Sequence, residues 1–391
     1  MGRDWLIAGD VAASIGRAEA SVQAFETGAS KLSDTEGIAR LLLRAEAVAS
    51  SRIEGLEAGP RRVLRAEAAV SAGEPSLDVG AEEILGNIRA MQRATGDEFV
   101  FANELTVDML RAIHRELLAG TRYDSIGGVV RTEQNWIGGN GYNPCGAVFV
   151  PPPAEVVETL LDDLCRFCSG DSLPPLAQAA IAHAQFETIH PFADGNGRTG
   201  RALIHLVLKR RGLTAHFVPP VSLVLATWSR QYVDGLTRYR HVGEWGSSEA
   251  YEGVNQWLGL FAEATSRAMD DVAAYELQVD ALQAEWRERV GPVRAGSAAE
   301  LVLQVLPQAP VVSVRSAAQL IGRSFEATNQ AVGRLVAAGV LQAVKVGRRN
   351  RAFEAPELID AFIGLERGLA SATGDTRGSP PQRPVPRHRN L

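Results

Sequence analysis

The sequence predicts a mainly α-helical protein with more than one domain. At 391 residues the chain is long enough for roughly two or three domains. From residue 37 to about residue 265, apolar residues recur mostly at the spacing of amphipathic helices. Residues 127–150 instead carry two short β-prone runs around a glycine-rich stretch, and the composition changes again after Pro292. These observations indicate a helical unit with one hairpin, followed by a smaller C-terminal domain.

The first element with clear boundaries is a helix over residues 37–54. One face of this helix carries an apolar stripe made of Leu41, Leu42, Ala45, Val48, Ala49 and Ile53. Gly55 is a natural C-terminal cap, because glycine adopts the left-handed conformation without steric cost. Glu54 then lies in the last turn, where the helix dipole disfavours negative charge. We therefore expect a cationic partner for Glu54, most simply an arginine.

Residues 127–150 are expected to form a β-hairpin with a long tip. The two strands would be Val129–Arg131 and Ala147–Val150, with the glycine-rich run 138–141 between them and three prolines after them. An ordinary surface hairpin is the alternative to a functional one.

Residues 176–209 predict two helices joined by a glycine-rich loop. Residues 176–189 are rich in alanine and contain no Gly or Pro, so they favour a helix. Pro191 disfavours helical geometry at the preceding residue, so this helix should end near His190, in an exposed place suited to chemistry. A second, buried helix is expected from Ala202 to Lys209.

The loop between these helices combines groups suited to binding a polyphosphate. A loop that leads into a helix N-terminus presents free N–H groups and the positive end of a dipole, which together bind anions. Gly195 and Gly197 would let a phosphate approach the main chain closely. Arg198 and Arg201 lie on one face of the new helix, and their planar guanidinium groups suit phosphate oxygens.

Two further side chains of the loop point to the chemistry. Asp194 suits Mg²⁺, because this ion prefers one or two carboxylates together with phosphate oxygens. His190 has an ordinary pKa near neutrality and can remove a proton from a hydroxyl. Together the groups predict phosphoryl or nucleotidyl transfer to a hydroxyl. The alternative is an incidental Gly-Asn-Gly turn. A metal site formed by His183 and His190 is a less favoured hypothesis, because no third ligand has suitable spacing.

Residues 190–201 resemble the signature of the Fic family: His, Pro, Phe, any residue, Asp or Glu, Gly, Asn, Gly, Arg, two of any type, then Arg. Every fixed position is matched. The resemblance implies a Fic-type helical bundle that transfers AMP from ATP to a Ser, Thr or Tyr hydroxyl of a protein, including itself. In such an enzyme His190 would be the general base and Asp194 would bind Mg²⁺. ATP would be bound by Gly195, Asn196, Gly197, Arg198, Thr199, Gly200 and Arg201.

The resemblance also implies which phosphate each of these residues would hold and which segment would bind the target. The N–H groups of residues 195–197 would cradle the phosphates, while Arg198 would hold the β-phosphate and Arg201 the γ-phosphate. The hairpin 127–150 would be the family's flap, which binds a target peptide by strand pairing.

Two more segments look like parts of the family. Residues 37–55 resemble its inhibitory helix, in which Glu54 would pair with Arg201 and block the γ-phosphate while Ser50 anchors the helix end. Residues 229–236 resemble the segment that closes the adenine pocket and would include Tyr232. Relatives often carry two adjacent tyrosines here, whereas this chain has one, so a core tyrosine is an equally good interpretation.

The C-terminal domain is predicted from an order of short elements. Helices are expected over residues 298–306, 314–321 and 325–338, with strands at 342–346 and 352–354. Three helices followed by a hairpin is the order of a winged helix-turn-helix domain, and the segment resembles the one at the C-terminus of many Fic proteins.

Basic residues dominate this domain. Against the single acid Glu326, residues 311–353 contain Arg315, Arg323, Arg334, Lys345, Arg348, Arg349 and Arg351. The excess of positive charge fits phosphate contacts on DNA. Dimerisation or docking of another protein is an equally ordinary use of such a domain.

These elements divide the chain into consecutive parts. Residues 1–85 would be an N-terminal helical region carrying the inhibitory helix, residues 86–265 the catalytic core, and residues 266–295 a helical linker. Residues 296–356 would be the winged helix, and the proline- and arginine-rich residues 372–391 should be disordered.

Composition limits the class of protein. A net charge of −6 and 46% hydrophobic residues are typical of a soluble globular chain. No apolar run reaches about 18 residues, and the start of the chain lacks the apolar core of a secretory signal. Three cysteines make no disulfide framework, and Cys165 and Cys168 are expected to be structural thiols. These features suit the cytoplasm.

The sequence thus predicts a self-inhibited protein adenylyltransferase that uses ATP and Mg²⁺ and binds its target protein through the flap. DNA and a second copy of the chain are further candidate partners. One alternative is an enzyme that removes AMP, with Glu54 orienting a water. Another is a DNA-binding regulator in which ATP serves only as a ligand switch.

Overall fold

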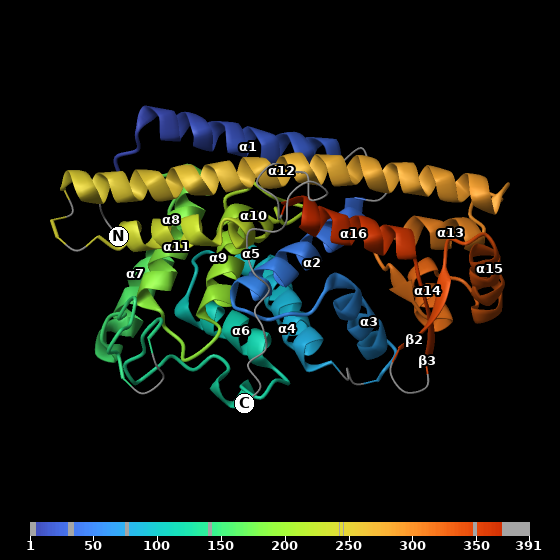
Figure 1. Ribbon diagram of the computed structural model, residues 1–391, viewed down its shortest axis with the longest axis horizontal. Coiled ribbons are helices and arrows are strands. Elements are labelled where there is room, and N and C mark those ends of the chain that lie inside the picture. The colour runs from blue at the N-terminus through green and yellow to red at the C-terminus, as the bar shows by residue number, and fades with distance from the viewer. Residues whose placement is uncertain are drawn as a thin grey trace.

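The computed structural model describes residues 5–29, 35–74, 78–139, 143–241, 243–244, 246–346 and 350–369, and it is mainly helical (Figure 1). The segment expected to be disordered, residues 372–391, lies outside the described residues, as do Arg348 and Arg349. Within the described helices, none combines the length and the apolarity that a membrane crossing requires.

The N-terminal region consists of four helices: α1 Gly9–Ala29, α2 Thr35–Ile53, α3 Pro60–Ser71 and α4 Val79–Ala94. The expected helix at 37–54 is therefore α2, and Gly55 follows it with a φ of +82°. Helix α1 packs along α12, away from the other three (Figure 1). Helix α2 lies inside the molecule and contacts α4, α9 and α10.

The central region holds the elements that carry the glycine-rich loop: α5 Asp97–Val100, α6 Val107–Leu118, α7 Val157–Ser169, α8 Pro175–Ile189, α9 Asn196–Arg210, α10 Val221–Thr227 and α11 Ser229–Tyr239. The helix expected at 202–209 begins earlier, at Asn196. Gly195, with a φ of +76°, reverses the chain directly before it, so the following residues already lie in the first helical turns.

The segment 127–150 differs from the expected hairpin. Val130 forms a bridge with Phe192, and Ile137 forms one with Phe149. The first expected strand therefore pairs with the glycine-rich loop and not with residues 147–150. Arg131 explains the difference, because its guanidinium donates to the carbonyls of the α8 end at Ile189 and His190 and holds this segment there.

Helix α12, Ser248–Val290, runs without a break for 43 residues. The expected boundary near residue 265 falls inside it. The sequence contains no proline over this range, and buried residues such as Phe261, Met269 and Tyr275 continue the helical stripe across the expected boundary. Ser247 caps its start by accepting from the Ala250 N–H, and Gly291, with a φ of +72°, ends it.

The C-terminal domain follows with α13 Ala298–Val305, β1 Val311–Val312, α14 Val314–Ile321, α15 Phe325–Ala337, β2 Gln342–Val346, β3 Asn350–Glu354 and α16 Pro356–Leu369. The strands form an antiparallel sheet in the order β1-β3-β2. Strand β1 and helix α16 were not expected from the sequence. Helix α16 packs back on α12 and α3, joining the domain to the rest of the molecule (Figure 1).

Two of the basic residues expected to face DNA have structural contacts instead. Arg334 donates to the carbonyl oxygens of Val290 and Pro292, at the end of α12. Arg323 donates to the carbonyl oxygen of Gly296.

Helix α3 connects α2 with the C-terminal domain. Arg44 of α2 forms a two-bond ion pair with Glu67 of α3 and also donates to the carbonyl of Gln308. Arg65 of α3 pairs with the buried Glu354 of β3 at 2.8 Å. The position of α2 is thereby tied to the C-terminal domain.

Helices α2 and α9 run antiparallel and meet along a line of polar contacts, which we call the polar seam. The seam consists of Glu46 and Ser50 on α2, Glu54 directly after α2, and His205, Arg201 and Gly197 on α9, each set spaced by about one helical turn. At one end Glu46 is fully buried and accepts from His205 Nε2 at 2.9 Å and from the backbone N–H of Ser222 at 2.7 Å.

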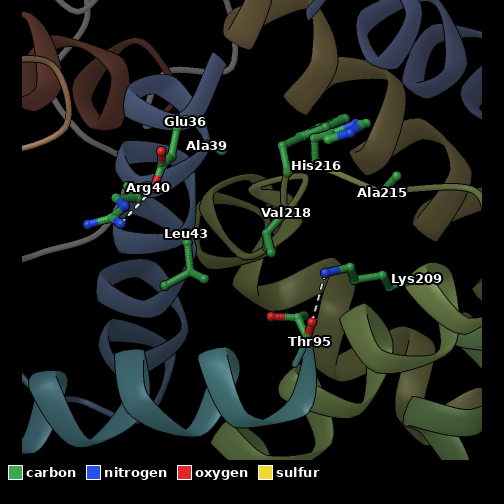
Figure 2. A pocket seen from close by; sticks show the side chains of 10 residues that line it. Glu36, Ala39, Arg40, Leu43, Thr95, Lys209, Ala215, His216 and Val218 are labelled. Atoms are coloured by element: carbon green, nitrogen blue, oxygen red, sulfur yellow. Dashed lines mark hydrogen bonds and ion pairs between the residues drawn. The ribbon is translucent and has the colours of Figure 1, made fainter. Parts of the chain in front are cut away.

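A cavity of about 340 Å³ lies at the other end of α9, away from the glycine-rich loop (Figure 2). Its walls include Leu43 of α2, Val218, and Lys209, whose ammonium donates to the carbonyl of Thr95.

Replacing Glu46 should test how strongly the seam holds α2. Glu46→Ala leaves His205 and the Ser222 donors without their buried partner, and we expect it to lower the free energy of unfolding by about 3–5 kcal/mol. Glu36→Ala, which removes an exposed ion pair with Arg40 from the same helix, should change it by less than about 1 kcal/mol. Urea unfolding followed by circular dichroism measures both, and equal losses would contradict the role of the seam.

Candidate active site

The glycine-rich loop is closed by one side chain. Asn196, the first residue of α9, accepts from the Phe192 N–H through Oδ1 and donates to the Phe192 carbonyl through Nδ2, both at 2.8 Å. His190 precedes the loop in the left-handed conformation, with a φ of +49°. Such a conformation is uncommon for a histidine and turns its side chain away from the axis of α8.

His114 of α6 supports the loop from beneath. Its ring stacks on Phe192 with the ring centres 3.7 Å apart. Its Nδ1 accepts from the Gly128 N–H, so Nε2 carries the proton and donates to the Asp194 carbonyl at 2.9 Å. Burial lowers the pKa of His114 to about 4, which keeps the ring neutral in this role. A Cβ at Gly195 would lie 2.9 Å from Leu117 Cδ2, so only glycine fits at this contact.

The ring of His190 is held by amide groups. Its Nδ1 lies 2.9 Å from Asn135 Nδ2 and 3.3 Å from Asn196 Nδ2. Burial lowers the pKa of His190 to about 4, and the nearby charge of Arg240 acts in the same direction. The imidazole is therefore neutral at physiological pH.

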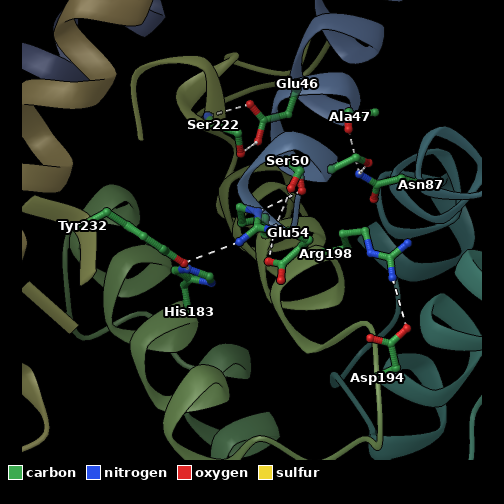
Figure 3. Close-up of polar contacts among 12 residues, drawn as sticks. Glu46, Ala47, Ser50, Glu54, Asn87, His183, Asp194, Arg198, Ser222 and Tyr232 are labelled. Atoms are coloured by element: carbon green, nitrogen blue, oxygen red, sulfur yellow. Dashed lines mark hydrogen bonds and ion pairs between the residues drawn. The ribbon is translucent and has the colours of Figure 1, made fainter. Parts of the chain in front are cut away.

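Asp194 and Arg198 face each other across the first turn of α9 (Figure 3). Arg198 is buried, and its Nη2 lies 3.4 Å from Asp194 Oδ2, whose side chain is 44% exposed. Arg198 Nε has no hydrogen-bond partner in the described part of the chain. A buried guanidinium with an unused donor beside an accessible carboxylate fits a phosphate and its Mg²⁺, which needs only one protein carboxylate in such a site.

Arg201 is the most enclosed charge of the site, and Ser50, Glu54 and Tyr232, which surround it, are shown in Figure 3. Its Nε donates to Ser50 Oγ at 2.8 Å, and its Nη2 donates to the Ser50 carbonyl at 2.8 Å and to Glu54 Oε1 at 2.6 Å. The third nitrogen, Nη1, lies 3.5 Å from the hydroxyl of Tyr232. Burial acts to lower the pKa of Arg201, but the neighbouring charges, first among them Glu54, outweigh it and raise the pKa.

The carboxylate of Glu54 lies directly over the start of α9. A Cβ on Gly197 would be only 1.8 Å from Glu54 Oε1 and 3.0 Å from Arg201 Nη1. The absent side chain of Gly197 is therefore what makes room for the carboxylate. An anion thus already occupies the N-terminal end of this helix, where free N–H groups favour negative charge.

Tyr232 lies in the core beneath Arg201. Its hydroxyl forms a 2.8 Å hydrogen bond with His183 Nε2, and both side chains are buried. The expected contact of Tyr232 with adenine stays a prediction. His183 stacks against Tyr232 and Trp257, which is a packing position.

Glu187 is a buried group that sequence reasoning missed. Its Oε1 has no hydrogen-bond partner within the described ranges. Burial raises its pKa to about 7, and the charge of Glu54 adds to this effect, while Arg201 and Arg240 oppose it. Glu187 and Phe186 also pack closely on Gly200, where a Cβ would lie 3.0 Å from Phe186 Cδ1.

The structure thus brings together residues from distant parts of the sequence. Residues 190–201 lie beside Ser50 and Glu54 on one side and beside Asn135 on another. Thr199 Oγ1 is buried without a hydrogen-bond partner in the part of the chain that the structure describes. The arrangement provides a neutral imidazole, an exposed carboxylate and two buried arginines around a helix N-terminus. Such a set can bind a polyphosphate and accept a proton from a hydroxyl.

A double-mutant cycle should reveal the contact between Glu54 and Gly197. In the wild-type chain Gly197→Ala forces the carboxylate away from Arg201, and we expect the free energy of unfolding to fall by about 1–3 kcal/mol. In a Glu54→Gly chain the same substitution meets no carboxylate and gains helix propensity, so we expect a rise of up to about 1 kcal/mol. Chemical unfolding of the four proteins measures the cycle. The same sign in both backgrounds would contradict the contact.

Residues 104–208 match the family model for the Fic/DOC family, and residues 12–96 match that for the Fic/DOC family N-terminal region. The chain is 33% identical to Protein adenylyltransferase fic-1 of Caenorhabditis elegans over 133 residues, which are 33% of this chain and 23% of that protein. It is 35% identical to Protein adenylyltransferase Fic of Drosophila willistoni over 138 residues, or 35% and 26% of the two chains. The chain thus spans about a quarter of the length of these curated relatives.

Solved structures show the same fold at lower identity. A Fic family protein from Desulfovibrio desulfuricans superposes with a TM-score of 0.56 at 19% identity, covering 91% of this chain and 98% of that one. Fic-1 residues 134–508 from C. elegans superpose with a TM-score of 0.50 at 19% identity, covering 68% and 74%. Residues 12–96 and 104–208 thus match the two parts of the Fic/DOC family, and the chain shares its fold with these structures.

Proposed function

We propose that this chain is a protein adenylyltransferase whose resting site is closed by Glu54. In the reaction, a Ser, Thr or Tyr hydroxyl oxygen of a target protein forms a bond to the α-phosphorus of ATP. The bond between that phosphorus and the bridging oxygen of the β-phosphate breaks, and pyrophosphate leaves. The hydroxyl proton passes to His190. The names of the curated relatives, which are protein adenylyltransferases, support this activity.

The residues around the α9 N-terminus would bind the substrate ATP. The N–H groups of Gly195, Asn196 and Gly197 would face its phosphates, and Arg198 and Arg201 would hold the β- and γ-phosphates. Mg²⁺, when bound at Asp194, would neutralise part of the phosphate charge.

The observation that carries the proposed inhibition is the set of bonds around Arg201. Its guanidinium is already engaged by Ser50, Glu54 and Tyr232. A γ-phosphate must therefore displace Glu54 before it reaches Arg201. A hydrogen bond between charged groups contributes about 1.5–3 kcal/mol, which corresponds to roughly a 10- to 100-fold effect on productive binding.

The target would bind along the flap segment, residues 127–150. Val129 and Val148 are exposed there, Ile137 pairs with Phe149, and Asn135 of the same segment contacts His190. Extended peptides add to such an edge mainly through main-chain hydrogen bonds, so this mode accepts many target sequences.

Labelling with α-labelled ATP tests the proposal. We expect Glu54→Gly to label protein, itself included, at least about tenfold more than the wild type, because Arg201 is then free for the γ-phosphate. Glu57→Gly is a matched control three residues further along the chain and should label like the wild type. His190→Ala should abolish labelling. The proposal fails if Glu54→Gly labels no protein above the level of His190→Ala.

Removal of AMP is a second candidate, favoured by the exposure of Glu54. Its side chain is 36% exposed and lies beside the anion site, so it could orient a water toward a phosphorus atom. In that case the wild type would release AMP from a labelled target, whereas Glu54→Ala would leave the label in place.

The C-terminal domain stays a candidate DNA-binding or docking module. The order of α13, α14, α15 and the β2–β3 hairpin supports a winged helix-turn-helix assignment. Because Arg323 and Arg334 already bond to backbone carbonyls, Arg315, Lys345 and Arg351 are the described candidates for contacts with DNA phosphates. Three other expectations also stay predictions: binding of a second copy of the chain, a cytoplasmic location, and a role for ATP as a ligand switch.

A further inference from the structure

The surroundings of His190 Nδ1 determine where the ring carries its proton. The two groups nearest to Nδ1 are the side-chain amides of Asn135 and Asn196, at 2.9 Å and 3.3 Å. Both present their nitrogen atoms. His190 Nε2 has no hydrogen-bond partner among the described residues.

The orientation of each amide is fixed by its other contacts. Asn196 accepts from the Phe192 N–H through Oδ1 and donates to the Phe192 carbonyl through Nδ2, so a flip would break both bonds. Asn135 Nδ2 lies 3.2 Å from the His190 carbonyl and 3.1 Å from the Phe192 carbonyl. Both of these partners are acceptors, so the atom that faces them must be the NH₂ group.

A neutral imidazole has one N–H and one nitrogen with a lone pair. An N–H at Nδ1 would point at amide donors, so Nδ1 carries the lone pair and Nε2 carries the proton. The low pKa of His190 agrees with a neutral ring. A nitrogen that already carries a proton has no lone pair with which to take another.

We propose that Asn135 is a positioning residue that holds His190 in the Nε2–H tautomer, so that the resting ring cannot accept a proton at its open nitrogen. The inference rests on the proposed role of His190 as the base. Nδ1, the nitrogen with the lone pair, is enclosed by the two amides and out of reach of a target hydroxyl. Transfer then needs Asn135 to leave Nδ1, so that the proton moves to Nδ1 and Nε2 becomes the acceptor.

The location of Asn135 suggests what moves it. It lies in the flap segment, two residues before Ile137, whose pairing with Phe149 forms the strand-like part of the segment. Gln134, next to it, donates to the Pro151 carbonyl at the end of the segment. A target strand that pairs with the flap would shift Asn135, the closer donor, and leave only the longer contact with Asn196, at 3.3 Å, opposing a proton on Nδ1. The base would thereby become competent when a target is bound, independently of Glu54.

Long-range ¹H–¹⁵N NMR of the full chain, with ¹⁵N-labelled histidine, tests the proposal. The His190 signals are assigned by their loss in His190→Ala. We expect the wild type to show a lone-pair resonance at Nδ1 and a protonated Nε2. In Asn135→Asp the carboxylate accepts a hydrogen bond, so the proton should appear at Nδ1. Gln134→Glu places the same charge on the neighbouring residue without touching His190, and it should leave the tautomer unchanged.

Three outcomes would overturn the proposal. A wild-type ring protonated at Nδ1 overturns it without any variant, so a poorly folded Asn135→Asp does not leave the question open. An unchanged tautomer in a folded Asn135→Asp shows that Asn135 does not set it. A change in Gln134→Glu as large as that in Asn135→Asp assigns the effect to charge and not to the contact.

The proposed function fails separately from this inference. If Glu54→Gly transfers no label while the wild-type ring is protonated at Nε2, the activity is wrong and the tautomer assignment stands. If label is transferred while the wild-type ring is protonated at Nδ1, the activity stands and the role of Asn135 is wrong.

Discussion

The burial of Arg201 is the constraint on which the rest of the structure depends. A guanidinium that is 1% exposed needs both counter-charge and hydrogen-bond acceptors, because an unpaired buried charge costs several kcal/mol. In this structure Ser50 and Glu54 supply them from α2, and Tyr232 completes the set. The pairing explains why α2 lies inside the molecule, and why its C-terminal turn stops above the start of α9.

The polar seam and helix α3 connect α2 to the rest of the molecule. Glu46 fixes the middle of α2 to α9 and α10, and Arg44 links the same helix to Glu67 and to the C-terminal domain. Because α2 is held at several points, the proposed departure of Glu54 from Arg201 is expected to involve this side chain and not the whole helix.

Local signals made part of the site predictable from sequence. Pro191 marks the end of α8, Gly55 marks the end of α2, and the spacing within residues 190–201 predicts the phosphate chemistry proposed for them. His114 and Asn135 could not be found in this way. They act through contacts with residues 80 and 55 positions away, and no local pattern records such distances. The pairing of Val130 with Phe192 and the unbroken course of α12 likewise depend on tertiary packing.

The unbroken α12 has a geometric consequence for the self-modification proposed above. Trp257 bonds to the Ala180 carbonyl of α8, and Trp286 bonds to Glu357 of α16. At 1.5 Å per residue these anchors lie about 44 Å apart along one straight helix. A hydroxyl at the far end of this helix therefore cannot swing into the site of its own molecule. Any AMP found there would come from a collision between two molecules, and its yield would rise with protein concentration.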